Sequence, residues 1–403
     1  MSRRRRTWLA ALLLALAGPA PAEVEDAIPA PAGATTPAAE TAPTAETTAS
    51  PPPAPDFEIF GVSVPPGQRR QLDWLVSESF VGTALPIPIQ VIHGTAPGRT
   101  LCLTAGIHGD ELNGVEIVRR AAAAIPAGEL RGTVIAAPIV NLHGFQRSSR
   151  YMPDRRDLNR FFPGRPSGSS ASRVAHSFFG AVISRCDALV DFHTGSFHRT
   201  NLPQVRADLQ RPDVAELALA FGEEIVLHGV GAAGTLRRAA CDAGIPSITY
   251  EVGEPRQLRE DEIARGAERV QTLLGRLGML PEQKELERMP EVFVRSRWVR
   301  VEDGGIMLAQ VEVGDRVQAG DVLATVTNPI SSHVRVLRSP HSGRVIGRAV
   351  NQVVIPGFAA FHIGLALPPE TPPEPAPPPG VAADEPEEPA EDAPSPETEE
   401  RPE

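Results

Sequence analysis

The stretch Thr100-Leu101-Cys102-Leu103-Thr104-Ala105 is followed at once by Gly106-Ile107-His108-Gly109-Asp110-Glu111. The first six residues are an apolar run that predicts a buried strand, and the apolar residues after Glu111 recur with a period near 3.6, which predicts a helix. At the junction, His108 and Glu111 stand three residues apart. An imidazole nitrogen and a carboxylate oxygen at this spacing can bind one metal ion, although a helix start can carry the same pair as an acidic cap beside a surface histidine.

Short apolar runs alternate with helical patterns on both sides of this stretch, between residues 57 and 290. The expected strands are Ile87–Ile92, Leu101–Ala105, Val134–Pro138, Ala188–Asp191 and Ser247–Glu251, and the expected helices are Glu111–Ala124, Ser172–Arg185, Asp213–Glu224 and Asp261–Leu277. This alternation predicts an α/β domain with a mixed, mostly parallel sheet flanked by helices. Ligands of such sheets bind beyond the carboxyl ends of the strands, where His108 lies.

Residues 291–366 have a different pattern, with short valine-rich segments separated by glycines and no helical period. This pattern predicts a small all-β domain after the α/β domain. The stretch from Val311 to Leu323 resembles the turn of biotinyl and lipoyl carrier domains. Such carriers hold their cofactor on a lysine, and the only lysine of this chain, Lys284, lies outside the domain. We therefore expect a lid or packing role.

The two ends of the chain differ from its middle. A cluster of arginines at 3–6, an apolar run at 8–17 and small residues near Ala22 predict a secretory signal peptide over residues 1–22, so that the protein would be periplasmic or secreted. Residues 23–56, rich in Ala, Pro and Thr, and residues 367–403, rich in Pro and Glu, predict disordered segments. The tail carries twelve acidic residues and one arginine, which account for the whole formal net charge of −11. The charge therefore says nothing about the substrate.

Three cysteines, Cys102, Cys186 and Cys241, lie in apolar contexts within the middle region. Their spacing matches no zinc-binding pattern. We expect buried, inert thiols, with one disulfide as the alternative in an exported protein.

Further candidate site residues follow other predicted strands. His193 comes directly after an apolar strand and is a candidate third metal ligand, and Asp191 could accept the second imidazole proton; a core histidine bonded to backbone is the alternative. Glu251 ends another apolar strand, where a buried carboxylate needs a partner or a role. Near a metal it could take a proton from bound water and return it to a leaving nitrogen. A solvent-facing acid is the alternative, and Glu254 is a rival for the role.

Two polar stretches are candidates for the pocket. The residues from Ser149 to Gly164 group several arginines with Asn159, which predicts an anion pocket because guanidinium groups bind carboxylates with two parallel bonds. A surface loop in salt bridges is the alternative. The stretch from Gly195 to Asp208 is also expected to line the pocket. It contains His198, Arg199, Asn201 and Arg206.

The order of these motifs resembles the succinylglutamate desuccinylase and aspartoacylase family over residues 57 to 364. The motifs are His108-x-x-Glu111, then Arg150 and Asp157-Leu158-Asn159-Arg160, then Asp191-x-His193-Thr194, then Glu251-x-Gly253. The resemblance implies a zinc-carboxypeptidase-like fold. It also implies one Zn²⁺ ion per chain, with the ligands His108, Glu111 and His193. The resemblance further implies that Arg150 stabilises the oxyanion and that Asn159 and Arg160 hold a substrate carboxylate. It implies that Glu251 acts first as the general base and then as the general acid.

The implied reaction is hydrolysis of a linear amide, the deacylation of an N-acyl amino acid or related carboxylate by metal-bound water. An exported metallocarboxypeptidase that trims peptides, such as cell-wall peptides, is one alternative. An inactive envelope protein that binds carboxylates is another. The expected partner is a small amide or peptide that carries a carboxylate, with no nucleic acid, and no membrane span is expected in the mature protein.

Overall fold

The computed structural model describes residues 54–78, 84–196, 198–281, 289–350 and 352–365. The predicted signal peptide, the predicted linker up to residue 53 and the acidic tail from residue 366 lie outside the described residues. Within these ranges, no helix is both long and apolar enough to cross a membrane.

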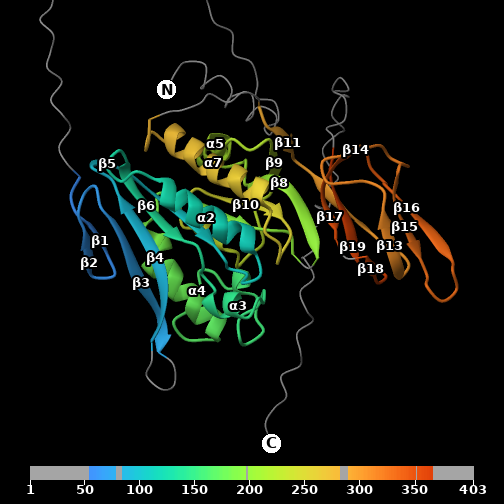
Figure 1. Ribbon diagram of the computed structural model, residues 1–403, viewed down its shortest axis with the longest axis horizontal. Coiled ribbons are helices and arrows are strands. Elements are labelled where there is room, and N and C mark those ends of the chain that lie inside the picture. The colour runs from blue at the N-terminus through green and yellow to red at the C-terminus, as the bar shows by residue number, and fades with distance from the viewer. Residues whose placement is uncertain (1–53, 79–83, 197, 282–288, 351, 366–403) are drawn as a thin grey trace, which may run out of the picture.

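One large sheet runs through the molecule (Figure 1). Its main strands are β3 (Arg69–Glu78), β4 (Ala84–His93), β5 (Ala96–Ala105), β6 (Arg131–Ala137), β7 (Ala188–His193), β8 (Arg199–Ala207), β10 (Ser247–Gly253), β12 (Ser296–Arg300), β17 (Gly343–Ala349) and β19 (Ala359–Leu365). Their order across the sheet is β12-β19-β17-β8-β10-β7-β5-β6-β4-β3. The four strands β10, β7, β5 and β6 are parallel to one another, and the strands on both sides of them are antiparallel.

Helices cover both faces of the parallel strands. The helices are α2 (Leu112–Ala124), α3 (Leu142–Gln146), α4 (Ser170–Ala181), α5 (Pro212–Phe221), α6 (Leu236–Asp242) and α7 (Glu260–Arg276), with 3-10 turns η1 (Leu158–Arg160) and η2 (Ile183–Arg185). One apolar core joins α2, α5 and α7 to alternate strand residues such as Val190 and Phe192, and a second core joins α4 and α6 to the residues between them, such as Leu189. The α/β class, with a mixed, mostly parallel sheet between helices, is confirmed.

Strand β8 was not expected from the sequence, because its charged and amide side chains hide the apolar alternation of a strand. The chain reverses after β7, and β8 then lies antiparallel to β10. Its last residues also pair with β9 (Ile225–His228), which in turn pairs with β11 (Glu291–Phe293). A short hairpin of β1 (Phe57–Ile59) and β2 (Val62–Val64) precedes the large sheet.

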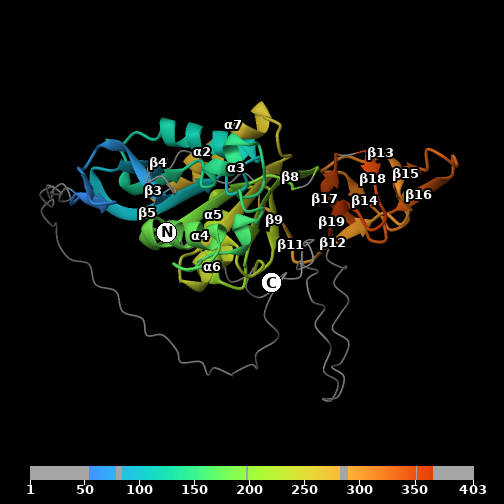
Figure 2. The same ribbon diagram turned by 90° about the horizontal axis from the view of Figure 1, so that it is seen from below.

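In the described residues after β11, the regular elements are all strands, as expected (Figure 2). A separate four-stranded sheet has the order β16 (Val334–Arg338), β15 (Val322–Thr327), β13 (Gly305–Ala309) and β18 (Val353–Val354), and β14 (Arg316–Val317) pairs with β17. However, β17 also pairs with β8, so the large sheet continues across residue 290. The domain boundary at that residue stays a prediction. We call the strands from β12 to β19 the C-terminal strands.

The expectation of three inert thiols was wrong for two of them. Cys102 and Cys186 form a disulfide, with their Cα atoms 5.8 Å apart, and Cys241 is a buried free thiol. Cys102 lies in β5, and Cys186 lies two residues before β7, which is the neighbouring strand. The pairing depends on the strand order, which brings together residues 84 positions apart and which cysteine spacing alone does not reveal.

Candidate metal centre

His108 and Glu111 lie on the turn between β5 and α2, and two glycines fix its backbone. Gly106 has a φ of 62°, a left-handed conformation that glycine adopts without strain. Gly109 packs directly on α3, where an added Cβ would lie 1.9 Å from the carbonyl carbon of Gly144. The backbone can follow this tight turn because both positions are glycine, and the turn places His108 and Glu111 at the carboxyl end of β5.

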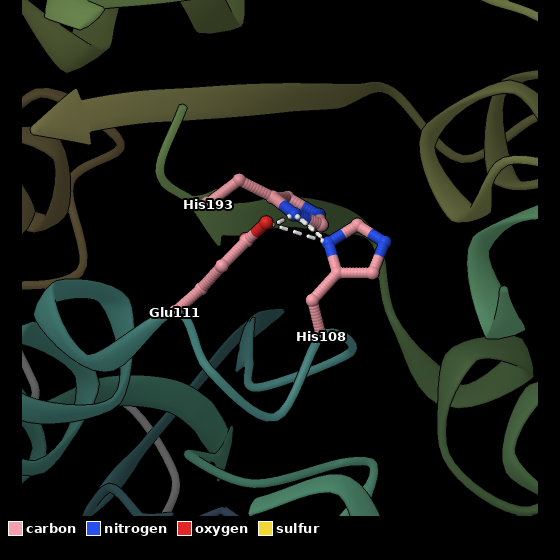
Figure 3. Close-up of side chains that lie close together, drawn as sticks. All are labelled: His108, Glu111 and His193. Carbon is pink, nitrogen blue, oxygen red and sulfur yellow. Dashed lines mark hydrogen bonds and ion pairs between the residues drawn. The ribbon is translucent and has the colours of Figure 1, made fainter. Parts of the chain in front are cut away.

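Glu111 stands immediately before α2, where an acidic residue often caps the helix. In the described part of the chain its carboxylate accepts no hydrogen bond from the first turn of α2. Its Oε1 lies 2.8 Å from Nδ1 of His108, and its Oε2 lies 2.9 Å from Nδ1 of His193, the last residue of β7. All three side chains are buried and point toward one another (Figure 3). The contacts thus differ from those of a simple acidic cap.

Each imidazole is anchored on its far side by a second carboxylate. Nε2 of His193 lies 2.8 Å from Asp191 Oδ2, and Asp191 Oδ1 accepts a hydrogen bond of 2.7 Å from the hydroxyl of Thr104. Nε2 of His108 lies 3.0 Å from Asp157 Oδ1. Such carboxylates fix the tautomer and the orientation of a metal-binding histidine. Asp191 has the position expected from the sequence.

The inner nitrogens of the two histidines fit a cation between them. If each Nε2 carries the proton that it donates to aspartate, each Nδ1 presents a lone pair. The two Nδ1 atoms lie 3.2 Å apart, beside the carboxylate of Glu111. Three acceptors that converge in this way repel one another unless a proton or a metal ion lies among them. Two imidazole nitrogens and a carboxylate are a donor set that zinc accepts in catalytic sites.

The pKa values at the cluster follow from the same charges. Burial lowers the pKa of His193, but Asp191 and Glu111 outweigh burial and raise that pKa well above its ordinary value. Burial raises the pKa of Glu111, but the two imidazoles outweigh it, so the pKa of this carboxyl is held well below its usual range. The cluster therefore favours a carboxylate with positive charge beside it.

Arg150 lies at the edge of the cluster and is buried. Its Nη1 donates to Glu111 Oε1 at 3.0 Å, and its Nη2 donates to Asp157 Oδ2 at 3.1 Å. Asp157 thus contacts both His108 and Arg150, although no role was predicted for it from the sequence. Its place in the sequence could have indicated a role, because it belongs to Asp157-Leu158-Asn159-Arg160, whose last two residues were predicted to bind a carboxylate.

Glu251 lies in β10 directly beside His193, because the two residues are paired in register on parallel strands. Side chains paired in this way project from the same face of a sheet. Two side chains of β8 contact the carboxylate: Asn201 Nδ2 donates to Oε2 at 3.0 Å, and Arg206 Nε lies 3.5 Å from Oε1. The expectation that these two β8 residues line the site is consistent with these contacts.

Asn159 and Arg160 lie in η1, after Asp157. The side-chain oxygen of Asn159 accepts a hydrogen bond of 2.8 Å from the backbone N–H of Leu236, the first residue of α6. Arg160 Nη1 donates to the backbone oxygen of Asn159 at 3.0 Å. The side-chain oxygen of Asn159 therefore has a structural contact. The binding of a substrate carboxylate by the NH₂ group of Asn159 and by Arg160 stays a prediction.

A cleft of about 560 Å³ opens beside Arg150. It is lined by Asp110, Ser149, Arg150, Tyr151, His198, Glu254, Pro255, Arg256, Gln257, Leu258, Arg259 and Val350. Glu254, the rival of Glu251, is buried in its wall and accepts a hydrogen bond of 3.0 Å from Nε of Arg259. Of the two glutamates, Glu251 is the one paired in register with His193.

These features define a class: α/β proteins with a candidate metal centre at the carboxyl ends of parallel strands. Residues 97–277 match the succinylglutamate desuccinylase/aspartoacylase catalytic domain. This match confirms the resemblance to the succinylglutamate desuccinylase/aspartoacylase family that the motifs indicated.

Two curated relatives illustrate the similarity. The N-alpha-acetyl-L-2,4-diaminobutyric acid deacetylase of Halomonas elongata is 26% identical over 263 residues, which cover 62% of this chain and 77% of the relative. The succinylglutamate desuccinylase of Burkholderia orbicola is 26% identical over 194 residues, which cover 43% of this chain and 55% of the relative. The chain spans about half the length of the second relative. Both relatives are named for the removal of an acyl group.

Solved structures show the same fold. A succinylglutamate desuccinylase from Silicibacter sp. is 26% identical, with a TM-score of 0.66, and the match covers 79% of this chain and 99% of that one. An ectoine utilization protein from Ruegeria pomeroyi is 23% identical, with a TM-score of 0.68, and the match covers 79% of this chain and 100% of that one.

Proposed function

We propose that the protein is a zinc-dependent hydrolase that cleaves the amide bond of an N-acyl amino acid or a related small carboxylate. The observation that carries this proposal is the convergence of two imidazole nitrogens and one carboxylate beside Glu251. The substrate class rests on the relatives, which are named as a deacetylase of N-acetyl-diaminobutyric acid and as succinylglutamate desuccinylases.

His108, Glu111 and His193 would hold the zinc ion. When bound, zinc acidifies water and polarises an acyl carbonyl. Glu251 takes one proton from the attacking water as the oxygen of that water bonds to the acyl carbon. It then gives this proton to the amide nitrogen as the carbon–nitrogen bond breaks. The products are a carboxylic acid and an amine; the remaining proton of the water passes from the acid to the amine, which gives a carboxylate and an ammonium group, and Glu251 returns to its starting charge.

The arginines have the complementary task. The guanidinium of Arg150 lies beside Glu111 and would stabilise the negative charge that develops on the acyl oxygen. Asn159 and Arg160 would hold the carboxylate of the substrate, through the Asn159 NH₂ group and the Arg160 guanidinium. Asp157 and Asp191 would keep the two imidazoles oriented through their Nε2 protons.

The test combines metal analysis with a substrate panel. The purified full chain is dialysed against Zn²⁺, and its zinc is measured after removal of the free metal. The protein is then incubated with Nα-acetyl-L-2,4-diaminobutyrate, N-succinyl-L-glutamate, other N-acyl amino acids and cell-wall peptides. We expect about one zinc per chain, release of the acyl acid, and loss of hydrolysis with a chelator.

The other outcomes identify the alternatives. Release of the carboxy-terminal residue from peptides, without deacylation, would replace the proposal with a metallocarboxypeptidase. A chain that retains no zinc and hydrolyses nothing in the panel would be a carboxylate-binding protein instead. That protein would still bind the panel compounds, which calorimetry would detect.

We also propose that the protein is exported. The predicted signal peptide carries this proposal, and the Cys102–Cys186 disulfide supports it, since disulfides persist in oxidising compartments. Fractionation of cells that express the full chain should recover it from the periplasm or the medium, with a new amino terminus near Ala22 in mass spectrometry. Recovery of the uncleaved chain from the cytoplasm would overturn the proposal.

A further inference from the structure

Two side chains of strand β8 contact the carboxylate of Glu251. Asn201 is buried, and its Nδ2 donates a hydrogen bond of 3.0 Å to Oε2. Arg206 Nε lies 3.5 Å from Oε1. The direction in which Glu251 presents its oxygens therefore depends on where β8 places these two side chains.

Asn201 lies between two glycines of neighbouring strands. It is paired in register with Gly253 of β10 on one side and with Gly347 of β17 on the other. A Cβ at position 347 would lie 2.7 Å from Oδ1 of Asn201, closer than such atoms approach one another. The backbone of Gly347 does not have a positive φ, so other residues could adopt its conformation. Position 347 thus lacks a side chain because the amide of Asn201 needs the space.

The C-terminal strands hold β8 at further points. Gln204 donates from its side chain to the backbone oxygen of Ile346 at 2.8 Å, and Arg199 Nε donates to that of Ala359 at 3.0 Å. The guanidinium of Arg199 also lies 4.9 Å from the centre of the Trp298 ring, within the range of a cation–π contact. These contacts fix the strand that carries Asn201 to a region outside residues 97–277, the segment that matches the catalytic domain.

We propose that Asn201 is a positioning residue for Glu251, and that Gly347 of the C-terminal strands sets the orientation of the Asn201 amide. The C-terminal strands are then part of the reaction centre, although they supply none of its proposed metal ligands. This inference rests on the proposed function, in which Glu251 transfers the proton.

The physical reason lies in the carboxylate itself. A glutamate side chain has three rotatable bonds, and a hydrogen bond to one oxygen restricts the carboxylate to one direction. A hydrogen bond to a charged group is worth about 1.5–3 kcal/mol, which corresponds to roughly 10- to 100-fold in rate. The backbone of Glu251 is fixed by β10 with or without Asn201, so loss of the amide should affect proton transfer more than folding.

The test measures kcat, KM, zinc content and melting temperature for three variants of the full chain: Asn201→Ala, Gly347→Ala and the double variant. The assay follows acetate release from Nα-acetyl-L-2,4-diaminobutyrate, or succinate release from N-succinyl-L-glutamate. We expect Asn201→Ala to lower kcat about 10- to 100-fold, with KM within about threefold and zinc content unchanged. We expect Gly347→Ala to lower kcat by a smaller factor.

The double variant tests whether Gly347 acts through Asn201. Alanine at position 201 removes the Oδ1 atom that the new Cβ would contact, so the double variant should be as active as Asn201→Ala alone. It should also fold if Gly347→Ala does not. A double variant whose kcat is lower by the product of the two single effects would overturn the role of Gly347.

A matched control separates positioning from general loosening of the C-terminal strands. Gly364 lies in β19, and a Cβ there would also lie 2.7 Å from a side chain, the ring of Phe293, away from Asn201. Gly364→Ala should lower the melting temperature and leave kcat within about twofold. An equal loss of kcat in Gly364→Ala and Gly347→Ala would overturn the proposal.

The variant Glu251→Gln distinguishes failure of the proposed function from failure of the positioning role of Asn201. If Glu251→Gln is as active as the wild type, the proposed function fails and the positioning role fails with it. If Glu251→Gln is inactive but Asn201→Ala keeps its kcat, the positioning role fails alone. If both lose activity, Asn201→Ala added to Glu251→Gln should cause no further loss.

Discussion

Two carboxylates of this molecule, Glu223 and Glu111, are buried to the same extent, and their surroundings differ. Glu223, which follows α5, accepts hydrogen bonds of 2.5 Å from Arg265 Nη2 and 3.1 Å from the hydroxyl of Tyr250. Glu111 is just as buried, but the two imidazole nitrogens at 2.8 and 2.9 Å converge on it from separate segments of the chain.

The difference lies in the match of donors and acceptors. Around Glu223, every close partner is a donor that carries its own hydrogen, so the cluster is complete without a ligand. Around Glu111, the inner nitrogens of two histidines and a carboxylate face one another, and the Nε2 protons are used on the outer aspartates. A buried carboxylate is therefore not by itself a sign of function, whereas two imidazole lone pairs that converge on a carboxylate point to a bound cation.

The largest effect is expected at the metal centre. His193→Ala removes one of the converging nitrogens and should abolish zinc retention and hydrolysis together, which metal analysis and the acyl-release assay would measure. His93 is the matched control: it is also buried, and its ring nitrogens bond Thr133 and Pro55. His93→Ala should keep its zinc. Normal zinc content in the His193 variant would show that the ligand set is wrong.

Glu251→Gln should separate chemistry from metal binding. Glutamine keeps the shape of the side chain but cannot take a proton, so kcat should fall by about 10²- to 10⁴-fold while zinc stays bound. Glu254→Gln, in the wall of the cleft, should keep kcat within a few-fold. The reverse result for the two variants would transfer the role of general base to Glu254.

A change in the cluster around Glu223 should affect stability and leave activity nearly unchanged. Glu223→Ala leaves Arg265 and Arg269 without their buried partner, which should lower the free energy of unfolding by about 3 kcal/mol. This lies at the lower end for a broken buried pair, because the Arg265 side chain remains 34% exposed. Urea denaturation measures the change. A tenfold loss of kcat in the folded variant would contradict the distinction between the two clusters.

The smallest effect concerns Glu262, on the α7 side of the sheet. Burial, then Glu254 and Asp261, raise the pKa of Glu262 from 4.5 to about 7. Between these two pH values the folded chain keeps a proton that the unfolded chain has lost, so stability falls as the pH rises through this window.

Glu262→Gln removes this titration. The variant should therefore melt about 2–4 °C higher than the wild type at pH 8 and nearly equal to it at pH 5. Glu268→Gln, on the exposed side of the same helix, is the control and should leave the melting temperature unchanged at both pH values. A difference between Glu262→Gln and the wild type that does not depend on pH would count against the raised pKa.

The sequence was sufficient where function depends on local order. His108 and Glu111 are three residues apart on one turn, so their proximity follows from the chain itself, and β5, β7 and β10 have strong apolar runs. Because parallel strands end at the same edge of a sheet, His193 and Glu251 could be expected near that turn. The fold class and the resemblance to the family could be predicted for the same reason.

The features that could not be predicted depend on strand order and on contacts between distant segments. Strand β8 lacks an apolar pattern, because its Asn201 and Gln204 are buried by hydrogen bonds to Glu251 and Ile346. The Cys102–Cys186 pair requires that β5 and β7 be neighbours. The second partner of Asp157, Arg150, becomes visible only when the loop before η1 is folded.

The pairing of β8 also determines which fragments of this chain can be handled in isolation. The residues Val205–Ala207 of β8 pair with β9, whereas the residues Arg199–Asn201 pair with β17. A fragment that ends at residue 290 keeps β9 and loses β17. The amino-terminal half of β8 would then offer unpaired N–H and C=O groups along an open edge, where a second fragment can add its own strand. Aggregation of such a fragment would report a missing sheet neighbour, while the residues proposed for catalysis were all still present.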